Sequence, residues 1–316
     1  MAKSVLSANH FHDEEAAYAY LEGKIWPEGP ICPHCGGFER ISKMQGKATR
    51  IGLYKCYQCR KQFRVTVGTV FESSHVPLNI WLQAVALLTS SKKGISSNQL
   101  HRTLGVTLKT AWFMSHRIRE AMRDGTLAPM GGSDGTFGNV EADETFIGRE
   151  PGVEKKRGGY SHKMKVLSLV DREAKQVRSV VINDLTAETI MPILEENIAK
   201  EATIMTDEAG QYGSAGDKFI DHQTVNHSEE EYVRGIVHTN TVEGYFSVFK
   251  RGMKGVYQHC AKHHLHRYLA EFDFRYNSRS RLGIEDVERS ERALAGIKEK
   301  RLTYKQPTRS VVQTGV

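Results

Sequence analysis

The clearest hydrophobic pattern in the chain is a helical one that covers residues 238–251 and continues to Met253. Its apolar positions recur every three or four residues, the spacing of one buried helix stripe, at Val242, Phe246, Phe249 and Met253. Glu243 and Lys250 are seven residues apart, so two turns place them together on another face, and Asn240 lies one turn before Glu243. A solvated surface pair would show the same spacing, so this pattern needs support from elsewhere in the chain.

Apolar runs upstream of this helix predict a sheet of five strands. The strands are expected at 139–148, 164–170, 177–182, 202–206 and 223–226, with an amphipathic helix capped by Thr186 at 186–198. Three strands, a helix, two strands and a helix form the order of an RNase H-like fold, the retroviral integrase-type catalytic domain. In that fold, acids lie on the first strand, at the end of the fourth and on a later helix. This sequence has Asp143, Asp207 and Glu243 at those places.

Clustered carboxylates of this kind have a chemical use. Two divalent cations about 4 Å apart bind several oxygen ligands and hold both the attacking and the leaving oxygen of a phosphodiester. Because Mg²⁺ favours carboxylates, water and phosphate oxygens, Mg²⁺ or Mn²⁺ is the expected catalytic cofactor. Glu144 ranks below Asp143, since alternation along a strand points it to the opposite face. Glu208 lies just beyond its strand, where alternation is no guide.

Two residues compete for the third metal ligand. Glu243 carries a full negative charge, which Mg²⁺ prefers to a neutral amide, and it shares a helix face with Lys250. Asn240 lies near the helix start, where Asn is a good N-cap. We therefore expect Glu243 as the ligand, with Asn240 as a cap or an auxiliary ligand.

Residues 77–128 predict a helical DNA-binding unit. Three helices are expected, at 79–90, 95–104 and 107–123. Asn79 and Thr107 are the expected caps of the first and third. A short helix, a turn containing Gly105 and a longer helix are typical of a helix-turn-helix. Plain three-helix packing units share this pattern. In the DNA-binding interpretation, the third helix contacts DNA through Lys109, Arg117 and Arg119.

Four of the five cysteines form two C-x2-C pairs separated by twenty residues, Cys32 with Cys35 and Cys56 with Cys59. This spacing predicts a zinc ribbon, in which four thiolates surround one structural ion. A short helix capped by Asp13 precedes the ribbon, and Trp26 is expected to pack on it. Disulfides are the alternative, but they suit a chain with an export signal.

A second group of candidate metal ligands occurs within residues 258–266. Cys260 and His264 are four residues apart, and so are His259 and His263. Because no second cysteine pair supports a metal site, we interpret this group as the polar, basic start of a helix.

Composition and charge point to a soluble protein that binds a polyanion. The chain has 316 residues, 39% hydrophobic and 26% charged, and no run approaches eighteen uninterrupted apolar residues. The N-terminus lacks an apolar signal core, so we expect a cytoplasmic protein that is nucleoid-associated when bound to DNA. The net charge is +7, and residues 234–281 carry nine Lys and Arg against three Asp and Glu. Double-stranded DNA is the simplest partner for such a surface. Further expected DNA contacts are Lys155, Lys156 and Arg157 in a basic loop, and Lys250, Arg251 and Lys254.

The chain divides into four expected parts in a multidomain α/β architecture. Residues 11–70 hold the short helix and the zinc ribbon, 77–128 the helix-turn-helix, 139–281 the RNase H-like domain, and 282–316 a C-terminal helix and tail. The last helix is expected at 293–300. A glycine-rich stretch before residue 139 is typical of a linker.

Several separate motifs add a family resemblance to these patterns. They are FHDEEAAYAYLEGKIWPEGPICPHCGG, YKCYQCRKQF, VEADETFIG, IMTDEAGQY, HTNTVEGYFSVFKRGMKGVY and HLHRYLAEFDFRYNSR. Together they resemble bacterial insertion-sequence transposases of the ISXO-like, zinc-ribbon group, from about Phe11 to Tyr304. The resemblance implies a DDE-type transposase with Asp143 and Asp207 as the first two metal ligands. It also implies that Lys250 contacts DNA phosphate.

The third metal position stays open in this resemblance, because the family has an acid there in some members and Asn in others. Both Glu243 and Asn240 are therefore candidates. We interpret the chain as a transposase that binds the terminal repeats of its element, cuts DNA and joins the freed 3′-hydroxyl to a target, acting as a homo-oligomer on DNA. The alternatives are an inactive DNA-binding regulator derived from such an enzyme and a metal-dependent nuclease without strand transfer.

Overall fold

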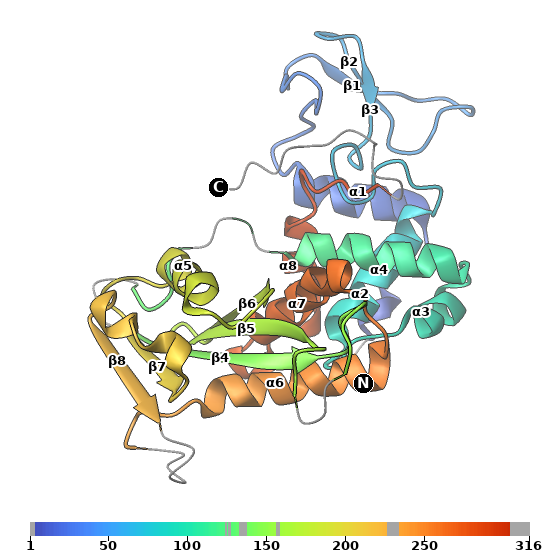
Figure 1. Cartoon of the computed structure of the whole chain (residues 1–316). Coiled ribbons are helices and arrows are strands. Elements are labelled where there is room, and N and C mark those ends of the chain that lie inside the picture. The colour runs from blue at the N-terminus through green and yellow to red at the C-terminus, as the bar shows by residue number, and fades with distance from the viewer. Residues whose placement is uncertain are drawn as a thin grey trace.

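A five-stranded sheet forms the largest β structure of the protein (Figure 1). The computed structural model describes residues 4–123, 125, 128–132, 138–155, 159–225 and 234–303. The strands are β4 (Asn139–Ile147), β5 (Met164–Asp171), β6 (Gln176–Ile182), β7 (Thr203–Asp207) and β8 (Asp221–Val225). Their order is β6-β5-β4-β7-β8, with antiparallel pairing from β6 to β4 and parallel pairing from β4 to β8. All five predicted strands are present, although the predicted last residue of the fifth, Asn226, lies outside the described residues.

Helices cover both faces of this sheet. One face packs against α5 (Ala187–Asn197), and the other packs against α6 (Asn240–Gly252) and α7 (Lys262–Asn277). Figure 1 shows α5 and α6 on opposite sides of the strands. The predicted apolar stripe of α6 is confirmed, because all four of its members are buried: Val242, Phe246, Phe249 and Met253.

The side chains of β4 alternate between these two faces. Val140 and Ala142 belong to the cluster on the α5 side, and Ile147 belongs to the cluster on the α6 side. Since strand side chains alternate with a period of two, Glu141 and Asp143 share the α6 face. The central strand therefore presents two acids to the helix that carries Glu243.

A second core is formed by helices from both ends of the chain. It contains residues of α1 (Glu14–Ile25), α2 (Leu78–Ser90), α3 (Ser97–Leu104), α4 (Leu108–Met122) and α8 (Asp286–Ala295). The last helix thus begins and ends earlier than the predicted 293–300, and Ala293, Leu294 and the following Ile297 pack into this core. No helix in the described part of the chain is long and apolar enough to cross a membrane.

Two of the predicted helix caps are confirmed. Asp13 and Thr107 each accept a hydrogen bond from the backbone N–H three residues later, at 2.7 and 3.1 Å. Asn79 is not a cap, because α2 begins one residue before it. Thr186 stands at the start of α5, but its hydroxyl donates to Asp184 instead of accepting from the helix.

Two arginines of α4 lie in the interior of the molecule. Arg119 is 1% exposed, and its Nε donates to Oε2 of Glu271 on α7 at 2.5 Å. Arg117 is 5% exposed, and its Nε donates to the carbonyl of Leu302 at 3.1 Å. The structure therefore does not support the predicted DNA contacts of Arg117 and Arg119, because α4 turns this part of its surface toward other elements of the protein.

The Arg119 contact belongs to a buried ionic network that joins α4 to α7. Glu271 also pairs with Arg275 and accepts a hydrogen bond from the Tyr257 hydroxyl. Burial alone would raise the pKa of Glu271, but the guanidinium groups of Arg275 and Arg119 hold it below its ordinary value. The carboxylate therefore stays charged and connects the helical core to the helices of the sheet.

The N-terminal ribbon is a small sheet of β1 (Ile41–Lys43), β2 (Tyr54–Cys56) and β3 (Gln62–Phe63) in that order. It projects beyond α1 as a separate lobe (Figure 1). Trp26, just after α1, lies edge-on against the rings of Tyr54 and Phe63, with centroids 5.6 and 5.7 Å away. The predicted packing of Trp26 on the ribbon is confirmed.

The buried network gives a stability prediction. Glu271→Gln should lower the free energy of unfolding by about 3–5 kcal/mol, because it leaves two buried guanidinium groups without their carboxylate. Urea denaturation followed by circular dichroism measures the change. Glu288→Gln is the matched control: its pair with Arg292 spans 2.7 Å between side chains that are 47% and 49% exposed. That change should cost no more than about 1 kcal/mol. Equal effects of the two substitutions would contradict the role given to Glu271.

Candidate functional site

The buried carboxylate of Glu141 fixes the start of α6 against the central strand. Its Oε2 accepts a hydrogen bond from the backbone N–H of Val242 at 2.8 Å. Its Oε1 accepts from Nε of Arg172 at 2.6 Å, and the same guanidinium donates to the carbonyl of His238. A carboxylate at a helix N-terminus satisfies a free backbone donor and complements the helix dipole. The carboxylate on β4 therefore sets where α6 begins.

Asp143 lies two residues beyond Glu141 on the same face of β4. It pairs with Ser168 of β5, and its Oδ1 accepts the backbone N–H of Glu144 at 2.7 Å. β4 and β7 run parallel, and Glu141 on β4 pairs with Met205 on β7. Asp143 and Asp207 each lie two residues further along, so they occupy corresponding positions on the two strands. The sheet thereby brings together two acids that are 64 residues apart in the sequence.

The charges around Asp143 identify the residues that lie near it. Burial, together with the negative charges of Glu144, Asp207 and Glu243, raises the pKa of Asp143 to about 8. Burial lowers the pKa of Lys250, whereas the charge of Asp143 raises it. Asp143 is thus the common neighbour of both other predicted acids and of the predicted lysine. No three of the described carboxylates, however, bring their oxygens within 4.8 Å of one another.

Glu144 points to the opposite face from Asp143, as alternation predicts. The Tyr212 hydroxyl donates to its Oε1 at 2.5 Å, and Nε2 of Gln211 donates to the same carboxylate at 3.3 Å. Burial raises the pKa of Glu144 even though these hydrogen bonds lower it. Sequence reasoning missed Tyr212, Gln211 and Glu141, although the first two stand in the motif IMTDEAGQY and the third in VEADETFIG.

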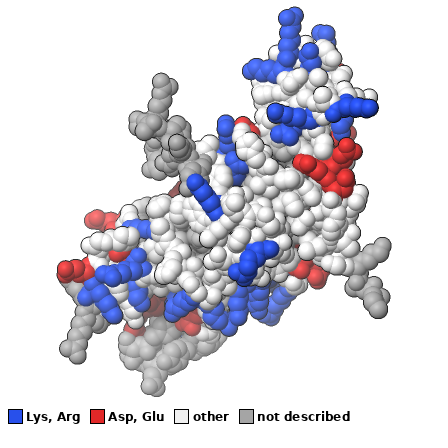
Figure 2. Space-filling model, turned by 90° about the vertical axis from the view of Figure 1, so that its right-hand side faces the viewer, with Lys and Arg blue, Asp and Glu red and all other residues white. Residues whose placement is uncertain are grey.

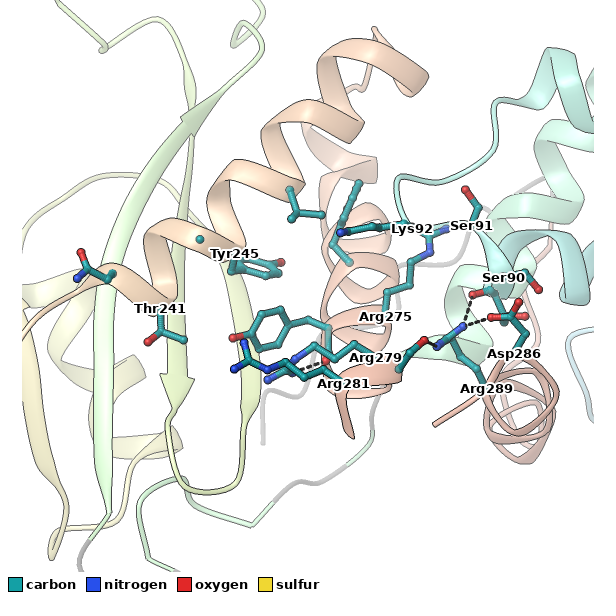
Figure 3. Close-up of a pocket in the computed structure, with 17 residues that line it drawn as sticks. Ser90, Ser91, Lys92, Thr241, Tyr245, Arg275, Arg279, Arg281, Asp286 and Arg289 are labelled. Atoms are coloured by element: carbon teal, nitrogen blue, oxygen red, sulfur yellow. Dashed lines mark hydrogen bonds and ion pairs between the residues drawn. The ribbon is translucent and has the colours of Figure 1, made fainter. Parts of the chain in front are cut away.

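Asn240 lies on the other flank of α6. It is the first residue of the helix, and Thr239 stands at the cap position without a side-chain cap. The prediction of Asn240 as an N-cap is therefore wrong, since Glu141 supplies the carboxylate there. Asn240 lines a pocket of about 620 Å³ together with Thr241 and Tyr245. Figure 3 shows this pocket between the start of α6 and arginines of the following helices.

The other predicted DNA contacts differ in exposure. Lys109, Lys155, Arg251 and Lys254 are exposed, and Lys250 is half-buried beside the acids. Lys156 and Arg157 lie outside the described residues. Figure 2 shows Lys and Arg gathered on the ribbon at the top and along the lower edge of one face. The exposed basic residues of the ribbon are Arg40, Lys43, Lys47, Arg50, Arg60 and Lys61.

The four ribbon cysteines fit a tetrahedral zinc ion. Their sulfurs all lie within 4.8 Å of one another. Cys32 and Cys59 have Sγ atoms 3.6 Å apart, and Cys35 and Cys56 have theirs 3.7 Å apart. Four sulfurs at about 2.3 Å from one ion would be separated by about 3.8 Å, which agrees with these distances. The donor set and its geometry suit zinc.

The second group of candidate metal ligands does not form such a cluster. Among the described residues, only the ribbon cysteines bring three or more potential ligand atoms within 4.8 Å of one another. The ring of His264 instead packs against His116 and Trp112, with centroids 4.7 and 5.4 Å away. The interpretation of residues 258–266 as a polar helix start therefore stands.

The ribbon geometry gives a prediction about metal content. The purified protein should contain one zinc ion per chain, and Cys56→Ser should lower that content severalfold, because a tetrahedral thiolate site loses one ligand. Elemental analysis by mass spectrometry measures both. Cys260→Ser is the control and should keep the full content. A zinc-free wild-type protein would contradict the assignment.

The raised pKa of Asp143 gives a pH prediction for zinc-loaded protein without Mg²⁺. The unfolded chain ionises this carboxyl near pH 4, but the folded protein does so near pH 8. Its contribution to stability is therefore present at low pH and is lost as the pH rises toward 8. Asp143→Asn removes this loss. The free energy of unfolding of the Asp143→Asn variant should exceed that of wild type by at least about 1 kcal/mol at pH 8 and by less at pH 5.5, since one pKa unit is worth about 1.4 kcal/mol. Urea denaturation at both pH values tests this, and a pH-independent difference would contradict it.

Comparison with known proteins identifies two regions of the chain. Residues 136–277 match the ISXO2-like transposase domain, and residues 12–62 match the transposase zinc-ribbon domain. A protein of Halobacterium salinarum, described as an uncharacterized protein in transposable element ISH50, is 29% identical over 280 residues. The match covers 84% of this chain and 91% of that relative.

Among solved structures, a chain of the simian T-cell lymphotropic virus intasome in complex with PP2A regulatory subunit B56 gamma aligns with 60% of this chain. The alignment covers 64% of that chain at 12% identity and a TM-score of 0.27, which is too low to carry an argument. The sequence matches decide the family. Because both the ribbon and the sheet region match domains of the same family, this chain belongs to the ISXO2-like transposases with an N-terminal zinc ribbon.

Proposed function

We propose that this transposase is of the DDE type, with Asp143, Asp207 and Glu243 as its metal-binding acids. The observation that carries the proposal is the electrostatic grouping around Asp143, which includes both other acids and Lys250. Burial and the neighbouring carboxylates together hold the pKa of Asp143 high, and a divalent cation would favour its charged form. Such strongly perturbed acids are typical of functional sites.

The sheet supports an RNase H-like description of the catalytic domain. Three antiparallel strands, β6, β5 and β4, continue into two parallel ones, β7 and β8. The first acid lies on the central strand β4, the second ends β7, and the third lies on α6 against the same face. This is the arrangement that we expect of the fold from the order of its elements.

The acids fit Mg²⁺ or Mn²⁺ in their chemistry. All three offer hard anionic oxygens, which these ions prefer. Held by Asp143, Asp207 and Glu243, such ions would supply Lewis-acid stabilisation of the negative charge that develops on a phosphodiester. The protein's own residues position the reactants: Glu141 holds α6 against β4, and Lys250 offers its ammonium group to a phosphate beside Asp143.

DNA recognition is assigned to the ribbon and to α3 and α4. The turn between these helices contains Gly105 with φ 67°, a left-handed conformation that glycine adopts without strain. This geometry supports a helix-turn-helix. Arg117 and Arg119 are buried, so Lys109, near the exposed start of α4, is the predicted residue of this helix that contacts DNA. The exposed lysines and arginines of the ribbon supply further phosphate contacts.

In this proposal the protein binds the terminal repeats of its element as a homo-oligomer, frees a 3′-hydroxyl at each end and joins it to target DNA. One assay distinguishes this transposase from an inactive regulator and from a nuclease without strand transfer. Purified protein, Mg²⁺ and labelled terminal-repeat DNA are incubated with a target plasmid. Joined product supports a transposase, cleavage alone a nuclease, and binding alone a regulator.

The third metal ligand gives the sharpest prediction for this function. Glu243→Gln should reduce Mg²⁺-dependent cleavage at least about 100-fold, because a neutral amide replaces a ligand that lies near Asp143. Asn240→Ala should cost less than about tenfold, because Asn240 lines the pocket on the other flank of α6. Gel analysis of labelled terminal-repeat DNA measures cleavage.

DNA binding without divalent cations is the control for both variants and should stay within about twofold of wild type. An active Glu243→Gln protein beside a folded but inactive Asn240→Ala protein would exchange the two roles.

A further inference from the structure

A second pocket lies next to the acid site, at the far end of β4. Its volume is about 510 Å³, within the range of small-molecule binding sites. The end of β4, the start of β5 and the turn after α6 form its walls. Lys250 belongs to this lining and also lies near Asp143, so the pocket adjoins the acid site.

The pocket is positively charged. Lys163, Lys250 and Lys254 all line it, and none of the described lining residues is Asp or Glu. Lys163 lies just before β5, whereas Lys254 belongs to the short π-helix Met253–Tyr257 that follows α6. Three ammonium groups from separate elements around one cavity favour an anion, and phosphate is the anion that this protein meets on DNA.

An exposed aromatic ring stands at the same pocket. Tyr160 is 56% exposed, although most large aromatic side chains are well buried in proteins. Its ring is stacked on Phe146 at the end of β4, with centroids 4.8 Å apart and planes 17° from parallel. The Lys163 ammonium lies 4.9 Å from the centre of the Tyr160 ring. Phe146 thus holds Tyr160 in a fixed orientation, and core packing does not account for its position.

A flat ring beside several cations matches the chemistry of a nucleotide. Bases stack on aromatic side chains, and the neighbouring phosphate binds lysine. A base inside a duplex has both faces covered by its neighbours, so it reaches such a pocket only when unpaired or turned out of the helix. A mononucleotide shares this chemistry, but the adjoining acid site favours a nucleotide within a DNA strand.

We propose that this pocket, the Tyr160 pocket, holds one unpaired nucleotide of the DNA strand that lies against Asp143. The base stacks on the Tyr160 ring and displaces the Lys163 ammonium toward the phosphate, which lies among the three lysines. The inference rests on the proposed function in one respect only: the strand is the one being cut. It extends that function, because DNA at the site is opened rather than fully paired.

Binding to DNA ends of defined structure tests this inference. Fluorescence anisotropy compares a blunt terminal-repeat duplex with duplexes that carry three unpaired nucleotides at the 3′ or the 5′ strand. Zinc-loaded protein without Mg²⁺ is used, so that nothing is cut. We expect wild type to bind one of the extended duplexes about tenfold more tightly than the blunt one, since stacking of one base is worth about 1–3 kcal/mol.

Variants of Tyr160 separate stacking from other contacts. Tyr160→Ala should lose the preference for the extended duplex, whereas Tyr160→Phe should keep it, because the ring rather than the hydroxyl stacks. Val287→Ala is the control, since Val287 is a similarly exposed side chain, 51% exposed, on α8, which has no proposed DNA contact. It should keep the preference. Lys163→Ala should weaken binding of the extended duplex and reduce its salt dependence by about one phosphate contact.

The inference fails if wild type shows no preference for either extension, or if Tyr160→Ala keeps the preference. It also fails if Tyr160→Phe loses the preference as Tyr160→Ala does. These results are independent of the proposed catalysis, which the cleavage assay tests separately. Cleavage without the preference would overturn the Tyr160 pocket alone, and the preference without cleavage would overturn only the proposed chemistry.

Discussion

The arrangement of the acid site depends on one hydrogen bond between a strand and a helix. Glu141 is fully buried on β4, and its carboxylate accepts the backbone N–H of Val242 at the start of α6. Asp143 lies two residues after Glu141 on the strand, and Glu243 lies one residue after Val242 on the helix. Because a buried charge is costly without a partner, Arg172 is needed on the other carboxylate oxygen. This contact therefore fixes the backbone at the start of α6, next to Glu243, against the strand that carries Asp143.

A second buried network protects that geometry from the repulsion of its own charges. The Tyr245 hydroxyl of α6 donates to Oδ1 of Asp273 on α7 at 2.5 Å, and the Ser179 hydroxyl of β6 donates to the same oxygen at 2.8 Å. Ser168, which pairs with Asp143, bonds to Ser179 at 2.8 Å. The chain of hydrogen bonds ties both helices to the sheet behind the acids. Like charges at the site are thus held in place by neutral and paired groups around it.

Periodicity and spacing predicted the parts of the site that are local in the sequence. The apolar stripe of α6, the five strands and the two cysteine pairs each follow from a repeat or a fixed interval. Partners across the fold could not be predicted in this way. Arg117 and Arg119 belong to a basic, polar run on α4, and only the packing of α7 and Leu302 shows that they are buried. For the same reason the sequence did not reveal the role of Glu141, whose partner is 101 residues away. Without knowledge of that contact, Asn240 was predicted as a cap.

The two flanks of α6 show why its polar residues are not equivalent. Glu243 is exposed and Lys250 is half-buried two turns later, and both interact electrostatically with the largely buried carboxyl of Asp143. Asn240 and Thr241 lie toward a pocket lined by arginines of the following helices, in which an additional carboxylate would meet cations instead of acids (Figure 3). The single acid of α6 is therefore the residue of this helix whose negative charge acts on Asp143.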